Sequence, residues 1–147
     1  MLPQLLLLAS SALASRSSMG LITAARGGDL ETVEKLLKEP DIDVNLQFSR
    51  GQWGALHEAA LYGHSKVISA IAGHSTSNVD IMTADGWSPL MLAAQAGKVE
   101  CVEVLLAAGA QTEQKDQRLG LTALQHAKEA GHSAVIQALT AAGGREL

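Results

Sequence analysis

Residues 85–110 read DGWSPLMLAAQAGKVECVEVLLAAGA, and this stretch contains the signals of two short helices in succession. Ser88 marks the start of the first helix, because its hydroxyl can accept hydrogen bonds from the free backbone N–H groups found there. Pro89 follows at the first helical position, where a missing N–H does no harm. Gly97 ends the helix, since the residue after a helix commonly needs a positive φ. Apolar residues then recur at helical spacing, at Val99, Val102, Leu105 and Leu106.

Closely similar stretches recur along the chain with a spacing of 34 residues. Leucines hold the spacing at Leu56, Leu90 and Leu124, and glycines hold it at Gly63, Gly97 and Gly131. The segments are GALHEAALYGH at 54–64, SPLMLAAQAGK at 88–98 and TALQHAKEAGH at 122–132, with a partial copy, GLITAARGGDL, at 20–30. One helix pair of this size is too small to bury its apolar face alone, so neighbouring copies must stack. We therefore expect Leu90 and Leu106 to be buried between copies.

The pattern resembles the ankyrin repeat, in which a turn precedes Gly-x-Thr-Pro-Leu-His, Ala-Ala, Gly-His, and then Val with a Leu pair. The resemblance covers roughly residues 20–142 and keeps its phase through four copies. It implies an all-α fold, an ankyrin-repeat solenoid of about four helix-turn-helix repeats with short β-hairpin-like turns. Tetratricopeptide repeats have a similar length, but they use large aromatic anchors in their helices, which this chain lacks.

The resemblance also sets the domain organisation. We expect a leader at 1–18, an ankyrin-repeat domain at 19–142 and a short tail at 143–147. Within the domain, the repeats are placed at 19–48, 49–82, 83–116 and 117–142. The first copy lacks a preceding turn, and the fourth has Lys128 in place of the second alanine. Both are interpreted as polar end caps, which a repeat stack needs because its terminal faces meet water.

The leader contains the apolar run LPQLLLLASSALA at residues 2–14. It is too short and too rich in serine for a stable membrane span. It resembles the apolar region of a secretory signal, with Ala12 and Ala14 before a cleavage point, although a basic flank is missing. An organelle-targeting peptide, a disordered arm and a translation start at Met19 stay open as alternatives. We expect a cytoplasmic or nuclear protein, or a secreted or organelle-targeted one if residues 1–14 are a cleaved signal.

No arrangement of residues in the sequence is typical of catalysis. A Gly-rich phosphate loop and paired cysteines are both missing. His57, His64 and His132 occupy the histidine positions of the repeat and are interpreted as structural, whereas His74 and His126 lie off the pattern without a carboxylate or thiol at ligand-like spacing. We therefore expect a protein that is not an enzyme, without catalytic residues, cofactor or metal.

The only cysteine, Cys101, lies on the apolar face of a second helix. This position favours a small buried hydrophobe over a reactive thiol.

The resemblance points to a binding surface, because ankyrin proteins generally use their turn tips and the exposed face of the first helices. Trp53, Trp87 and Leu121 occupy one position in three successive copies, so stacking would align them as an apolar row beside Tyr62. Exposed aromatic residues in a row often mark binding hot spots, while the alternative is that each tryptophan packs against the next hairpin. The candidate partner-binding residues are Arg50, Trp53, Tyr62, Asp85, Trp87, Gln95, Arg118 and Leu121.

The formal net charge of −4 argues against a nucleic-acid partner, because phosphate binding needs clustered lysine and arginine. The expected partner is therefore another protein. We predict a monomeric, non-catalytic module that acts as a small adaptor, scaffold or inhibitor through the concave face of the stack. The alternative is a secreted or organelle-targeted ankyrin effector whose leader is cleaved.

Overall fold

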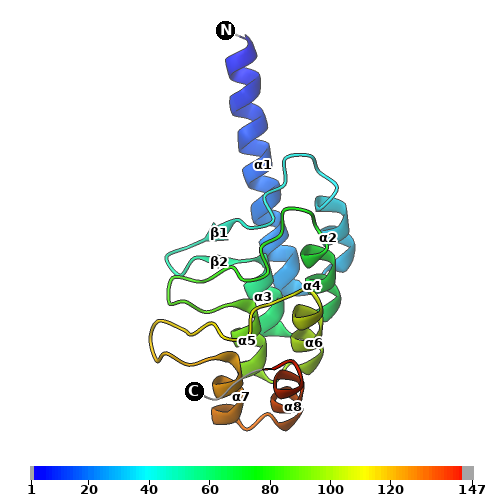
Figure 1. The fold of residues 1–147 in the computed structure, drawn as a ribbon. Helices are drawn as coiled ribbons and strands as arrows, with labels where there is room; N and C mark the ends of the chain where they lie inside the picture. Colours follow the sequence, from blue (N-terminus) through cyan, green and yellow to red (C-terminus); the bar gives the residue numbers. More distant parts are fainter. Residues whose placement is uncertain (1, 144–147) are drawn as a thin grey trace.

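The computed structural model describes the backbone of residues 2–143 and the side chains of residues 12–143. Within these residues, four antiparallel helix pairs lie in a row, and turns project from one side (Figure 1). The elements are α1 (Leu2–Gly27), α2 (Leu30–Leu36), β1 (Gln47–Phe48), β2 (Trp53–Gly54), α3 (Ala55–Tyr62), α4 (Ser65–Ala72), α5 (Pro89–Ala96), α6 (Val99–Ala107), α7 (Ala123–Ala130) and α8 (Ser133–Ala141).

The helices form two layers. The first helices α1, α3, α5 and α7 contact one another in sequence, and the second helices α2, α4, α6 and α8 form a parallel outer row. Each helix also packs against its own partner in the pair. This is the predicted all-α ankyrin solenoid of four helix pairs.

The predicted helix starts and ends are confirmed. The Ser88 hydroxyl accepts a hydrogen bond from the Met91 N–H at 3.2 Å at the start of α5. At the start of α7, Thr122 and Gln125 cap each other's backbone N–H groups. Gly97, which ends α5, has a φ of 73°, in the left-handed region that other residues adopt only with strain.

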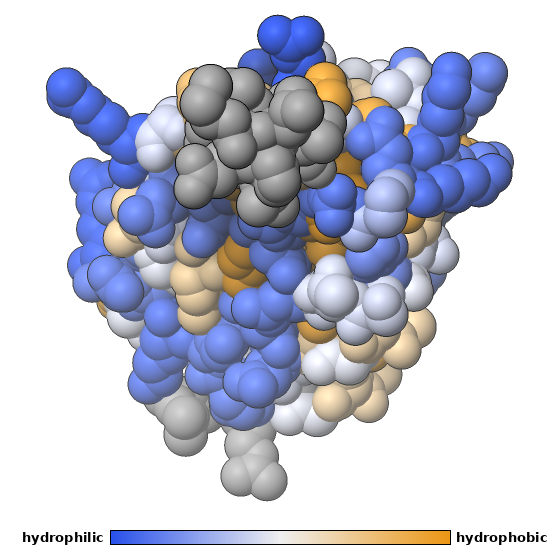
Figure 2. All heavy atoms as spheres, turned by 90° about the horizontal axis from the view of Figure 1, so that it is seen from above, coloured by the Kyte–Doolittle hydropathy of each residue, from blue (hydrophilic) through white to orange (hydrophobic). Residues whose placement is uncertain are grey.

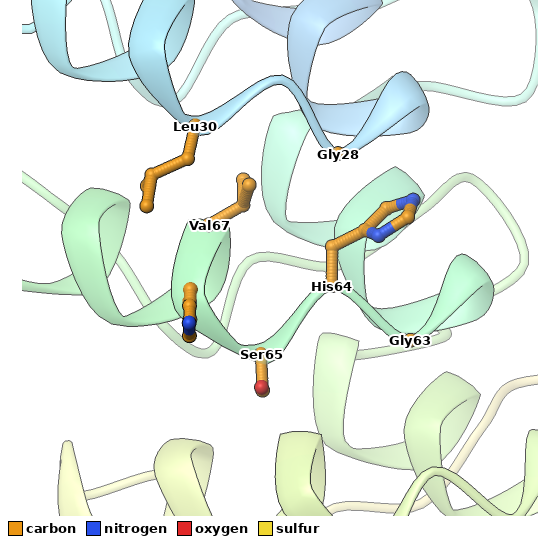
Figure 3. Close-up of a pocket in the computed structure, with 7 residues that line it drawn as sticks. Gly28, Leu30, Gly63, His64, Ser65 and Val67 are labelled. Carbon is orange, nitrogen blue, oxygen red and sulfur yellow. The ribbon is translucent and has the colours of Figure 1, made fainter.

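Histidines that directly follow the helix-ending glycines connect neighbouring repeats. The His64 ring lies under the turn between α1 and α2, beside Gly28, at the edge of a shallow hollow (Figure 3). Its Nε2 donates to the Arg26 carbonyl oxygen at 3.0 Å. His132 repeats the arrangement two copies later, with its Nε2 2.9 Å from the Gln95 carbonyl oxygen. These contacts support the structural interpretation of both histidines.

The core lies between the helix pairs and consists mainly of leucine, alanine, valine and isoleucine. Leu90 is only 1% exposed, as predicted. The prediction for Leu106 needs correction, because that side chain is only partly buried at the edge of the core and Leu105 takes the fully buried position. Cys101 is buried on the inner side of α6.

The boundary that we predicted between residues 18 and 19 does not interrupt the helix, because α1 is continuous from Leu2 to Gly27. Ser18 is buried, donates to the Ala14 carbonyl oxygen at 2.8 Å and accepts from the Asp43 N–H at 2.9 Å. The last turn of the predicted leader therefore packs on the repeat domain. None of the described helices combines the length and apolar character that crossing a membrane requires. Residues 144–147 of the predicted tail lie outside the described residues.

Candidate protein-binding face

The turns that project from the stack are linked to one another by backbone hydrogen bonds. In the β1–β2 hairpin, Phe48 pairs with Trp53. The next two turns, at 83–87 and 116–121, are closed in an equivalent way. In each of them, the N–H of the first residue donates to the carbonyl oxygen of the last residue. The Ala84 N–H donates to the Gly51 carbonyl oxygen at 2.9 Å, and the Gln117 N–H donates to the Asp85 carbonyl oxygen at 3.1 Å. The three turns thus form one connected surface.

The row of Trp53, Trp87 and Leu121 lies at the base of these turns. All three side chains are half-buried, so the residues of the predicted row do not stand fully exposed. Trp53 contacts the His57 ring edge-on, with ring centroids 6.0 Å apart. Trp87 lies over the His126 ring, with centroids 4.3 Å apart. The two tryptophans therefore support the turns as well as offering apolar surface.

His57 holds the β1–β2 hairpin against α3. Its Nδ1 accepts from the Gly54 N–H at 3.0 Å, and its Nε2 donates to the Ile81 carbonyl oxygen at 2.8 Å. This pair of bonds requires the neutral ring, since one nitrogen accepts while the other donates. Burial lowers the pKa of His57 despite the opposing effects of backbone hydrogen bonds to Ile81 and Trp87.

Asp116 holds the last turn in a similar way. Its carboxylate accepts from the backbone N–H groups of Arg118, Leu119 and Leu121, at 2.9, 2.7 and 2.9 Å. It also accepts from His126 Nε2 at 2.9 Å, and both side chains are buried. Burial alone would raise the pKa of Asp116, but these hydrogen bonds together hold it below its ordinary value.

The sequence-based interpretation missed the pair of Asp116 and His126, which are ten residues apart. Alignment of the copies contains a signal that could have found it. His126 occupies the repeat position of Glu58 and Leu92, which are buried, so a histidine there needs a polar partner. Asp116 begins its turn at the position of Thr83 and is the last acidic residue before His126 in the sequence.

Glu58 has its own partner, which the sequence-based interpretation also missed. The Arg26 guanidinium donates two hydrogen bonds to its carboxylate, at 2.7 and 3.1 Å. Glu58 is buried while Arg26 remains mostly exposed, so the pair joins the first two repeats along the row of first helices.

The remaining candidate residues are exposed and reach solvent from the turns and the first helices. Tyr62 is 51% exposed at the end of α3. Four polar side chains are exposed on the same elements: Arg50, Asp85, Gln95 and Arg118. We call these five residues, together with Trp53, Trp87 and Leu121, the hairpin face.

The remaining side chains that could carry chemistry are Cys101 and the potential metal ligands. Burial, with a smaller effect of Glu100, raises the pKa of the Cys101 thiol to about 11, so the nucleophilic thiolate is scarce. Among the described residues, no three histidine, cysteine or acidic side chains come close enough to hold a metal ion. Exposed apolar and charged groups on connected turns are suited to contact with another protein.

Comparisons with known proteins agree with the fold. A family model described as "Ankyrin repeats (3 copies)" matches residues 21–116. The probable E3 ubiquitin-protein ligase XBOS31 of Oryza sativa subsp. japonica is 32% identical over 125 residues, which are 85% of this chain and 28% of that protein. The E3 ubiquitin-protein ligase KEG of Arabidopsis thaliana is 39% identical over 90 residues, 61% of this chain and 5% of the relative.

The nuclear factor NF-kappa-B p105 subunit of Gallus gallus is 35% identical over 101 residues, 67% of this chain and 10% of the relative. The chain thus spans 28% or less of the length of each of these three proteins. The family model covers well over half of the chain, and its repeats coincide with the stacked helix pairs. The chain therefore belongs to the ankyrin-repeat family, whose repeats mediate protein–protein interaction.

Proposed function

We propose that this ankyrin stack acts as a small, non-catalytic adaptor, scaffold or inhibitor that binds one partner protein, as a monomer, through the hairpin face. The observation that carries the proposal is the series of backbone-linked turns, which presents Arg50, Asp85 and Arg118 in a row above half-buried apolar side chains. A surface fixed in this way loses little conformational freedom when a partner binds.

The chemistry of the hairpin face indicates the kind of partner. Trp53, Trp87 and Leu121 offer an apolar centre, while exposed arginines flank an aspartate. A complementary surface would have an apolar centre with acidic groups opposite Arg50 and Arg118. Charge complementarity of this kind favours the correct partner and speeds its association.

The proposal is tested with variants that change only exposed side chains. Proteins captured from the source organism by the wild type are identified by mass spectrometry, and the affinity of the main partner is then measured with Tyr62→Ala/Arg118→Ala. We expect a loss of about tenfold or more, as is typical of hot-spot residues. Tryptophan variants are unsuitable as the first test, because Trp53 and Trp87 also support the turns.

The matched control is Lys66→Ala/Glu103→Ala, which removes exposed side chains from the second helices α4 and α6. It should bind like the wild type. Circular dichroism should show that both double variants are folded. Equal affinity of a folded Tyr62→Ala/Arg118→Ala variant would refute the role of the hairpin face.

We further propose that the protein works in the cytoplasm or nucleus, with a secreted or organelle-targeted effector as the alternative. The packing of Ser18 against the Asp43 backbone supports a mature chain that keeps Ser18, as a start at Met1 or near Ser15 would. Sequencing the N-terminus of the protein from its natural source separates the two. A start at Met1 or Met19 supports the intracellular proposal, whereas a start near Ser15 means export.

Two of the relatives are named as ubiquitin-protein ligases, but this chain spans 28% or less of their length. The shared segment coincides with the ankyrin repeats of this chain. The likeness therefore supports the binding role of the repeats and does not support transfer of the ligase activity.

A further inference from the structure

The series of linked turns is incomplete at its N-terminal end. The Ala84 and Gln117 N–H groups each donate to a carbonyl oxygen of the preceding turn. Ser49 occupies the equivalent position in the β1–β2 hairpin, one residue after the first residue of the turn. No turn precedes it in the described chain, because α1 runs through that part of the first repeat (Figure 1). Within the described part of the chain, the outer edge of the β1–β2 hairpin therefore has no neighbouring turn.

A hollow lies beside this edge, between α1 and the hairpin. We call it the N-terminal hollow; its lining residues are Met19, Gly20, Ile22, Thr23, Arg26 and Phe48. Its volume is about 260 Å³, several times the space of a water molecule, so a large side chain fits. Phe48 is 54% exposed and Met19 is 41% exposed, which leaves apolar surface open at this end.

The surroundings of the hollow are polar and cationic. Arg16 precedes Met19 on the same stripe of α1, and Arg50 lies two residues after Phe48 at the tip of the hairpin; both are exposed. Arg26 lies at the other end of the hollow and is held in place by the buried Glu58, whose charge it balances. Arg16 and Arg50 thus place two exposed positive charges on the elements that border the hollow, while Arg26 is paired with Glu58. Figure 2 looks down on this end of the molecule, where small hydrophobic areas lie among mostly hydrophilic ones.

From this juxtaposition we propose that the N-terminal hollow binds an extended segment of the partner protein. The segment places a large apolar or aromatic side chain between Met19 and Phe48, and one of its carbonyl oxygens accepts from the Ser49 N–H, as the missing turn would. Acidic residues beside the apolar one face Arg16 and Arg50. This inference rests on the proposed function and adds the chemistry of the partner.

Such a segment would gain affinity from two sources. A backbone hydrogen bond to the hairpin edge fixes its register, and apolar burial in the hollow selects the side chain. The combination explains why a large phenylalanine stands exposed at an edge that elsewhere in the stack is covered by the preceding turn.

The test uses a displayed library of random linear peptides, selected on the folded full chain. We expect the enriched peptides to share an aromatic or large aliphatic residue next to Asp or Glu. Phe48→Ser should lower their affinity about tenfold or more, because it removes one wall of the hollow. The Ser49 amide should become protected from hydrogen exchange when peptide is added to the wild type.

The matched control is Leu119→Ser, which removes an apolar side chain that is 63% exposed at the other end of the series of turns. It should leave peptide affinity unchanged. No enriched peptides, or equal binding to Phe48→Ser, would overturn the proposal. Phe48-dependent self-association in sedimentation velocity would also overturn it, because a second copy would then occupy the hollow.

The two proposals fail separately. If the natural partner loses affinity for Tyr62→Ala/Arg118→Ala but binds Phe48→Ser normally, the hairpin face stands and the N-terminal hollow does not. If neither variant changes the affinity for the partner, the hairpin face itself is refuted.

Discussion

At the scale of single residues, His57 and Gln125 cap the start of a first helix with two different side chains. Each stands at the third position of a first helix and accepts a hydrogen bond from a backbone N–H at the helix start, Gly54 for His57 and Thr122 for Gln125. Glutamine does so at any pH, whereas histidine must be neutral. The repeat tolerates both because the position needs only an acceptor at the right distance.

This difference predicts a pH dependence of stability. Because the folded pKa of His57 is lowered, the stability that the neutral ring contributes is complete above the unfolded pKa of 6.5 and is lost as pH falls toward the folded value. Thermal melts of wild type and His57→Gln, taken between about pH 7 and about pH 5, should show a smaller fall of Tm for the variant. Parallel falls would contradict the role of His57.

Burial at the helix interface predicts a second difference between residues. Leu90→Ala should lower the free energy of unfolding by about 2–5 kcal/mol, because a fully buried side chain leaves a cavity. Leu106→Ala should cost clearly less, since that side chain is only partly buried. Urea denaturation of both variants measures the two losses, and similar values would speak against the positions assigned to these leucines.

At the scale of elements, the turn from the first to the second helix joins neighbouring repeats as well as ending a helix. Gly97 and Gly131 have nearly the same left-handed φ, 73° and 77°. A Cβ on Gly97 would lie 2.7 Å from the His132 ring, whereas a Cβ on Gly131 would meet nothing within 4 Å. Among the described residues, only the first of these turns has a following repeat against it.

The two glycines therefore separate backbone strain from contact between repeats. Gly131→Ala should destabilise by about 1–2 kcal/mol through its left-handed backbone alone. Gly97→Ala should lose more, because it also displaces His132 from the Gln95 carbonyl oxygen. Denaturant titrations of the two variants give the difference, and an equal loss would mean that the histidine contact contributes nothing.

How far the elements could be predicted depended on how local their causes are. Helix starts and ends followed from Ser88, Thr122 and the glycines, because caps and left-handed residues act within a few positions. The half-burial of Trp87 could not be read in the same way, since it depends on a histidine in the next repeat. The burial of Ser18 could not be predicted either, since its partner Asp43 lies in a loop that is distant in the sequence.

At the scale of the whole molecule, the repeats are arranged so that one side holds the stack together and the other carries the turns. The polar groups under the turns are paired between or within repeats, as Arg26 with Glu58 and Asp116 with His126 show. These pairs fix the turns without using the side chains at their tips. The connected tips are therefore left for a partner.

Site-specific photo-crosslinking tests the position of that partner most directly. A photoreactive amino acid is placed in turn at Tyr62 and Arg118, on the hairpin face, and at Lys66 and Glu103, on the second helices. After irradiation with the natural partner, adducts should form from the first two positions and not from the last two. Adducts from Lys66 and Glu103 with none from Tyr62 and Arg118 would show that the partner binds the opposite side of the stack.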